Sequence, residues 1–262
     1  MMIALLFCVN AFSQSKVLPQ VVPDEVFDSP QPQMTQELVF TKKRHSLKLL
    51  SQYAQTNFSQ SGTGTTFSTG KTTSLGLLAQ HDYLIGDKNL FRTDVFLQPT
   101  GFKNPTTNKT QNITRTYLAS HYGWKRMLAQ VRMELLAGAA FSHRSAFSDA
   151  QNLASSSQSL APSLGIKFNY EINPQISVAT SAFINSPLWL KEEKKTGFYE
   201  SGYQAMLRTG MSLKLSKSLR IQAEAMFEQE VLSFSGEGER SIKDARVTYR
   251  ALSFPIGVEY EF

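Results

Sequence analysis

The chain has 262 residues and a formal net charge of +6, from 27 lysines and arginines against 21 aspartates and glutamates. The basic residues are scattered along the chain, so this modest charge does not indicate a nucleic-acid-binding protein. Cys8 is the only cysteine, which excludes a disulfide within one chain. No stretch of about 18 uninterrupted apolar residues occurs, so we expect no transmembrane helix.

The first 45 residues are expected to precede the folded part of the chain. Residues 3–9 form a short apolar run, and Ala11 and Ser13 follow at the spacing of a signal-peptidase site. Residues 1–13, including Cys8, are therefore predicted to be a secretory signal peptide. Residues 14–45 contain four prolines and little periodicity. They predict a flexible lead-in, which is either a solvated tail or a plug or docking segment.

The remaining residues, 46–262, alternate between segments with strand periodicity and polar gaps. Side chains of a β-strand point alternately to two faces. In residues 251–262 apolar side chains occupy every second position, and small or charged ones occupy the positions between them. The same alternation predicts about ten strands, at residues 46–58, 72–84, 90–102, 111–122, 128–141, 159–170, 175–186, 202–215, 219–231 and 248–262.

The gaps between these strands are alternately long and short. The short ones are predicted to be hairpin turns at residues 86–89, 123–126, 173–174 and 216–218. The long ones cover residues 59–71, 103–110, 142–158, 187–201 and 232–247. An even number of strands joined in this way is typical of a transmembrane β-barrel. The expected fold is therefore an all-β, antiparallel, up-and-down transmembrane barrel.

The chain ends in Gly257-Val258-Glu259-Tyr260-Glu261-Phe262. Its glycine, tyrosine and terminal phenylalanine (Gly257, Tyr260 and Phe262) resemble the Gly-x-x-Tyr-x-Phe assembly signal of bacterial outer-membrane β-barrel proteins. Pro255 departs from that pattern, which has a polar residue two positions before the glycine. The resemblance covers residues 46–262 at the level of architecture.

Several expectations follow from this resemblance. It implies the outer membrane of a Gram-negative envelope, short turns in the periplasm and long loops outside the cell. It also implies three kinds of partner: the barrel-assembly machinery, membrane lipid with lipopolysaccharide, and other envelope proteins that contact the lead-in or the loops. Aromatic residues should form a band at each membrane interface. The expected outer band contains Phe58, Phe102, Phe141, Phe183 and Phe227.

Ten charged residues are predicted to line the lumen because they alternate with apolar residues along the strands. They are Arg92, Asp94, Arg132, Glu134, Lys167, Arg208, Lys214, Arg220, Glu224 and Glu259. Two interpretations remain open for them. They either form a salt-bridged filling that holds a narrow barrel shut, or they line a narrow pore for small solutes, including anions.

An enzymatic alternative rests on His143 and Ser145, with Asp149 nearby. This spacing resembles the His-x-Ser pair of the lipid A deacylase family, but residues 159–170 lack the glutamate which that family places there. Omptin-type proteases need an Asp–His pair and an Asp pair at the outer rim, and only His143 with Asp149 could begin to supply them. We therefore expect neither catalytic residues nor a cofactor, and the four histidines lack the spacing of a metal site.

Three functions are consistent with the sequence, and we rank them as follows. The first is a non-enzymatic envelope component, acting as a scaffold, an adhesin or a subunit of a larger outer-membrane assembly. The second is a narrow diffusion pore, and the third is a lipid A or peptide hydrolase at the outer rim. The aromatic residues of the loop at 187–201 could form a contact surface in the first case.

Overall fold

A computed structural model describes residues 45–63, 65–103, 110–146, 156–193, 196–237 and 243–262. The predicted signal peptide and all of the predicted lead-in except His45 lie outside these residues. Within the described part, no helix is long and apolar enough to cross a membrane.

The described residues form twelve strands. In chain order these are β1 (His45–Thr63), β2 (Thr65–Ser68), β3 (Thr72–Ile85), β4 (Asn89–Lys103), β5 (Thr110–Leu128), β6 (Val131–Ala146), β7 (Ser157–Glu171), β8 (Ile176–Asn185), β9 (Trp189–Glu192), β10 (Phe198–Lys214), β11 (Leu219–Ser235) and β12 (Lys243–Glu261).

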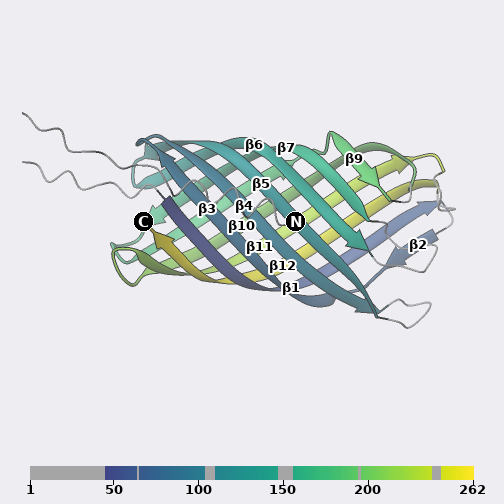
Figure 1. The fold of residues 1–262 in the computed structure, drawn as a ribbon, viewed down its shortest axis with the longest axis horizontal. Helices are drawn as coiled ribbons and strands as arrows, with labels where there is room; N and C mark the ends of the chain where they lie inside the picture. The colour runs from purple at the N-terminus through teal and green to yellow at the C-terminus, as the bar shows by residue number, and fades with distance from the viewer. Residues whose placement is uncertain (1–44, 64, 104–109, 147–155, 194–195, 238–242) are drawn as a thin grey trace, which may run out of the picture. The chain divides into compact units, whose positions relative to one another are not determined.

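Ten of these strands form a closed antiparallel wall, which confirms the expected fold (Figure 1). Each wall strand pairs with its neighbours in the chain, and β1 closes the barrel by pairing with β12. The two short strands stand outside this cycle: β2 folds back on the end of β1, and β9 pairs with the beginning of β7. They fall in stretches that were predicted to be loops. Strand extension there satisfies backbone groups that an irregular loop would leave without partners.

The strands are staggered around the wall. A hydrogen-bonded row that starts at Ser46 of β1 passes through Asp82, Arg92 and the other wall strands. It returns to β1 at Phe58, a shift of 58 − 46 = 12 residues. In a closed barrel such a stagger tilts the strands against the barrel axis. Residues from distant rows therefore meet at one height inside the barrel.

Three of the four predicted turns lie between strands as expected, and their polar residues explain why. The Asn173 side chain accepts hydrogen bonds from the backbone nitrogens of Gln175 and Ile176, at 2.9 and 2.8 Å. Ser216 does the same for Ser218 and Leu219. Such local bonds stabilise tight turns. We call the end of the barrel with these short connections the turn end, and the opposite end the loop end.

The turn predicted at residues 123–126 is wrong. β5 continues to Leu128 and reverses at Ala129 and Gln130, where Ala129 has a φ of 53°. Gly123 serves close packing instead. A Cβ atom at this position would lie 2.7 Å from Leu136 Cδ2 inside the barrel.

The outer face of the wall is apolar. On β12, Leu252, Phe254, Ile256, Val258 and Tyr260 are all exposed, while the residues between them point inward. Aromatic side chains are exposed near the turn end on several strands, namely Phe91, Tyr122, Trp124, Phe168 and Tyr170. This belt suits contact with lipid.

The expected outer aromatic band is only partly correct. Phe58 and Phe183 are buried inside the barrel, at 3% and 6% exposure, because they share a strand face with other inward residues. Phe227 points outward, and the side chain of Phe102 lies outside the described part.

Candidate functional site in the barrel interior

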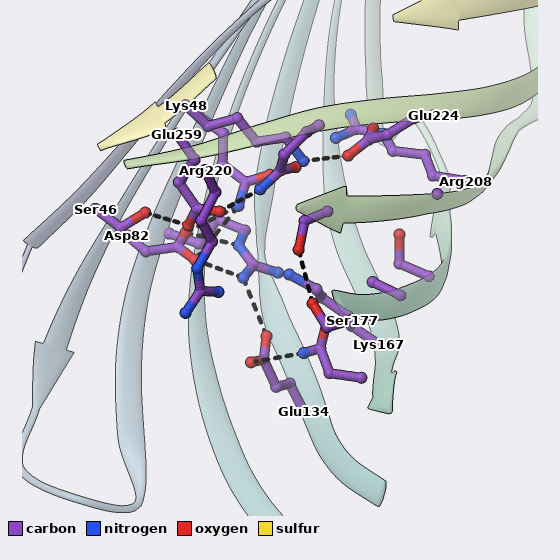
Figure 2. Close-up of a pocket in the computed structure, with 18 of the residues that line it drawn as sticks. Ser46, Lys48, Asp82, Glu134, Lys167, Ser177, Arg208, Arg220, Glu224 and Glu259 are labelled. Atoms are coloured by element: carbon purple, nitrogen blue, oxygen red, sulfur yellow. Dashed lines mark hydrogen bonds and ion pairs between the residues drawn. The ribbon is translucent and has the colours of Figure 1, made fainter. Parts of the chain in front are cut away.

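A cavity of about 200 Å³ lies inside the barrel at the turn end. All ten wall strands contribute lining residues, so the cavity depends on barrel closure. Figure 2 shows charged side chains from several strands converging in it. Eight of the ten residues predicted from the sequence line this cavity: Arg92, Arg132, Glu134, Lys167, Arg208, Arg220, Glu224 and Glu259.

The other two predicted residues lie elsewhere. Asp94 lies beyond the inner end of the cavity, where its carboxylate pairs with Arg208 at 3.4 Å. Lys214 is exposed at the turn end of β10 and does not line the cavity.

Arg92 is the centre of the largest ion-pair network in the cavity. Its Nε and Nη2 donate to the two carboxylate oxygens of Asp82, at 2.8 and 2.7 Å. Nη2 also donates to Glu134 at 3.0 Å. A guanidinium matches a carboxylate in this bidentate geometry, which holds both groups in place. Sequence analysis missed Asp82, although it shares the inward face of β3 with Gln80.

Other carboxylates of the cavity are also held by donors. Sequence analysis missed Lys48, which stands two positions before the buried Leu50 on the inward face of β1. Three further contacts are Lys48–Glu224, Arg220–Glu261 at 3.0 Å and Ser46–Glu259 at 2.5 Å.

An apolar layer closes the cavity on its inner side. On four strands, a charged inward side chain is followed by an apolar inward side chain two positions further from the turn end. The pairs are Lys48 and Leu50, Asp94 and Phe96, Arg208 and Met206, and Glu224 and Met226. These apolar residues belong to one buried cluster, so the charged cavity ends at a packed layer.

A second charged layer lies beyond the apolar one. Arg115 pairs with Glu228, and Arg144 pairs with Glu230. The Arg115 guanidinium also lies over the Tyr249 ring, 4.8 Å from its centre. Sequence analysis did not identify these four charges. Arg115 lies in the strand predicted at residues 111–122 but was not among the predicted lumen residues, and Arg144 lies in a predicted loop.

The loop end is closed by a second apolar cluster. Its buried members include Phe58, Ile113, Leu232, Phe234 and Val247. Leu190 of β9 and Tyr199 of β10 pack against it, so residues predicted to lie in a loop contribute to the interior. Tyr199 donates a hydrogen bond to the Pro187 carbonyl at 2.8 Å, which fixes the chain between β8 and β10.

The alternative hydrolase residues do not point into this interior. His143 lies between the inward-facing Ser142 and Arg144 on β6, so it belongs to the outer face. Ser145 shares that face and directs its hydroxyl to the Thr114 carbonyl at 3.5 Å. Asp149 lies outside the described residues. No group of three or more potential metal ligands occurs in the described ranges.

The exposed apolar belt and the closed barrel together identify a transmembrane barrel. Leu75 and Leu164 are 68% and 60% exposed on the outer face, which water would penalise and lipid would not. Closed barrels cross a membrane because no strand edge is left without backbone partners. The chain is an outer-membrane β-barrel protein, as its C-terminal motif led us to expect. Its turn end therefore faces the periplasm.

Comparison with one solved structure supports the fold, and others resemble it less. The outer membrane protease OmpT from Escherichia coli matches with a TM-score of 0.52 and 8% sequence identity, over 87% of this chain and 99% of OmpT. The translocator domain of the autotransporter NalP from Neisseria meningitidis gives a TM-score of 0.45 and 14% identity, over 83% of this chain and 88% of that domain. At such identities the likeness concerns the fold alone.

A third solved structure is more distant. OprG from Pseudomonas aeruginosa gives a TM-score of 0.38 and 12% identity, over 84% of this chain and 97% of OprG. No protein-family model matches the chain, and no curated protein matches it.

Proposed function

We propose that this outer-membrane barrel is closed to diffusing solutes and acts as a non-enzymatic envelope component. The observation that supports closure is the order of side chains inside the barrel. Along β11 the inward residues run from charged Glu224 through Met226 to Glu228 and Glu230, and then to apolar Leu232. Each of these residues packs or pairs with residues from other strands, so four layers fill the interior.

The buried ion pairs also oppose the passage of a solute. A solute that crossed the barrel would have to separate the pairs Arg115–Glu228 and Arg144–Glu230. Breaking a buried ion pair leaves uncompensated charges, which costs about 3–5 kcal/mol for each pair. Barrels with wide aqueous channels have many more than ten strands.

A scaffold role is supported by the height of the wall. β1 and β12 have 19 residues each, whereas about 9–11 residues suffice to cross a bilayer. On the outer face of β12 the apolar run gives way to Arg250, Thr248 and Arg246 towards the loop end. The wall and the short strands β2 and β9 therefore extend beyond the lipid, where other envelope components can contact them.

The test is solute and ion flux through refolded barrel in liposomes, with residues 14–262 and with residues 45–262. We expect no flux above that of empty liposomes for either form. Flux through the longer form would establish the alternative, a narrow pore. Flux through the shorter form alone would contradict closure by the barrel's own side chains and would assign a plug function to residues 14–44.

The partner role needs a separate test. Co-purification from native membranes should be compared between the full mature chain and a variant that lacks residues 14–44. A specific envelope protein that is retained by the full chain and lost by the variant is expected. An unchanged set of partners would argue that the lead-in does not recruit them.

A further inference from the structure

Two lysines in the periplasmic cavity form no direct ion pair with a carboxylate. Lys125 of β5 and Lys167 of β7 line the cavity, and neither side chain makes an ion pair or hydrogen bond with the described residues. The carboxylate nearest to both in the sheet is Glu134 of β6, which stands directly opposite each of them in the strand register. This carboxylate is turned instead to Arg92, at 3.0 Å.

The wall from β4 to β7 therefore has an excess of positive charge. Arg92, Lys125, Arg132 and Lys167 face the cavity there. Among the carboxylates of these strands, Glu134 pairs with Arg92 and Arg132, and Asp94 pairs with Arg208. Asp82 of the adjacent strand is bound by Arg92. Glu171 of β7 is exposed four positions beyond Lys167, nearer the turn end. Excess positive charge inside a barrel is costly unless an anion neutralises it or water solvates it.

The neighbours of Lys167 suit an oxyanion. Ser181 of β8 stands directly opposite Lys167, and Arg208 of β10 stands directly opposite Ser181. The Ser181 hydroxyl makes no hydrogen bond with the described residues and lines the same cavity. Figure 2 shows the Lys167 side chain reaching from the wall towards the centre of the charged cluster. Ammonium and hydroxyl donors that converge in this way bind oxygen atoms of an anion.

We propose that the cavity at the periplasmic end is a binding site for a small phosphate-type oxyanion, with Lys167 as the main ligand. Lys125 and Ser181 complete the site. A volume of about 200 Å³ accommodates a single phosphate group together with water. The apolar layer behind the cavity makes it a pocket with one opening, so this inference rests on the closed interior proposed above.

The direct test is calorimetric titration of inorganic phosphate into the refolded mature barrel in detergent, in a buffer that contains chloride as the competing ion. We expect saturable binding of one phosphate per barrel. Lys167→Met should weaken it at least tenfold, because the side chain keeps its length and loses its charge. Ser181→Ala should weaken it several-fold. Lys214→Met is the matched control, since Lys214 is an exposed lysine at the same end of the barrel but outside the cavity, and this variant should bind phosphate like the wild type.

Thermal unfolding gives a second test, in which phosphate should raise the unfolding temperature of the wild type but not that of Lys167→Met. Without phosphate, Lys167→Met should unfold at a higher temperature than the wild type, because it removes one cation from a wall with excess positive charge. With phosphate, the wild type should gain stability and the variant should not. Folding of each variant is checked by electrophoresis, in which the unheated, folded barrel migrates faster than the same sample after heat unfolding.

Two results would overturn the site: no saturable phosphate binding by the folded wild type, or equal binding by Lys167→Met and wild type. Failure of the closed-barrel proposal is distinguishable, because it appears as flux in liposomes. Flux together with binding of one phosphate at Lys167 would support the binding site and contradict the closed interior.

Discussion

Arg115 of β5 and Glu228 of β11 form an ion pair across the full width of the barrel. Five steps around the wall separate these two strands in either direction, so the pair joins opposite sides. Arg208 of β10 and Asp94 of β4 repeat this relationship, again five steps apart. Such cross-barrel pairs fix the distance between opposite walls and block the interior at the same time.

The Arg115–Glu228 pair should therefore control stability. Arg115→Met leaves the Glu228 carboxylate buried without its partner, and we expect a loss of about 3–5 kcal/mol in the free energy of unfolding. The double variant Arg115→Met with Glu228→Leu should recover most of that loss, because no charge then remains unpaired. Urea unfolding of the refolded barrel in lipid measures both values. Equal stability of the single variant and the wild type would show that solvent reaches this layer.

Removal of one or two interior layers should leave the barrel closed. Phe96→Ala with Met226→Ala thins the apolar layer, but the Arg115–Glu228 pair still spans the barrel. We expect this variant to remain closed in planar bilayers, and the further exchange of Arg115 and Glu228 to alanine to leave it closed as well, because the Arg144–Glu230 pair and the loop-end apolar cluster still fill the barrel. A matched control replaces the outward Leu75 and Leu164 by alanine and should stay closed. Channels in the wild type would be incompatible with the filled interior.

The turn between β5 and β6 can be located by two glycine exchanges. Ala129 has a φ of 53°, which costs an alanine about 1 kcal/mol that a glycine avoids, so Ala129→Gly should stabilise the barrel. Gly123→Ala should destabilise it by about 1–3 kcal/mol, because the added methyl group meets Leu136 and Leu90. If the turn lay at residues 123–126, the two exchanges would have the opposite effects. Unfolding in urea separates these outcomes.

The level of the membrane on β12 can be tested by a charge on its outer face. Ile256 lies within the apolar belt, whereas Thr248 lies between the outward arginines nearer the loop end. Ile256→Lys should cost about 2–4 kcal/mol in lipid, and Thr248→Lys about 0–1 kcal/mol. The comparison is made by unfolding from phospholipid vesicles. Similar costs at both positions would mean that the belt extends over the whole strand or does not contact lipid.

Much of the fold followed from local sequence pattern, but the partners of the interior residues did not. Alternation in residues 219–231 placed Arg220 and Glu224 on the inward face of a strand, where the structure has them. The same reasoning missed Arg144 and Asp82, and it treated Gly123 as part of a turn. A glycine that allows close packing across strands looks the same in a sequence as a glycine that allows a turn.

The sequence by itself determined the number of wall strands and the face on which most side chains lie. It could do so because the two-residue period of a strand is a local property of the backbone. Only the tertiary structure decided which charges meet. The stagger of 12 residues and the closure of β1 on β12 bring Arg115 opposite Glu228 and leave Lys167 without a direct ion pair. Stagger and closure are properties of the whole cycle of strands, so no single segment encodes them.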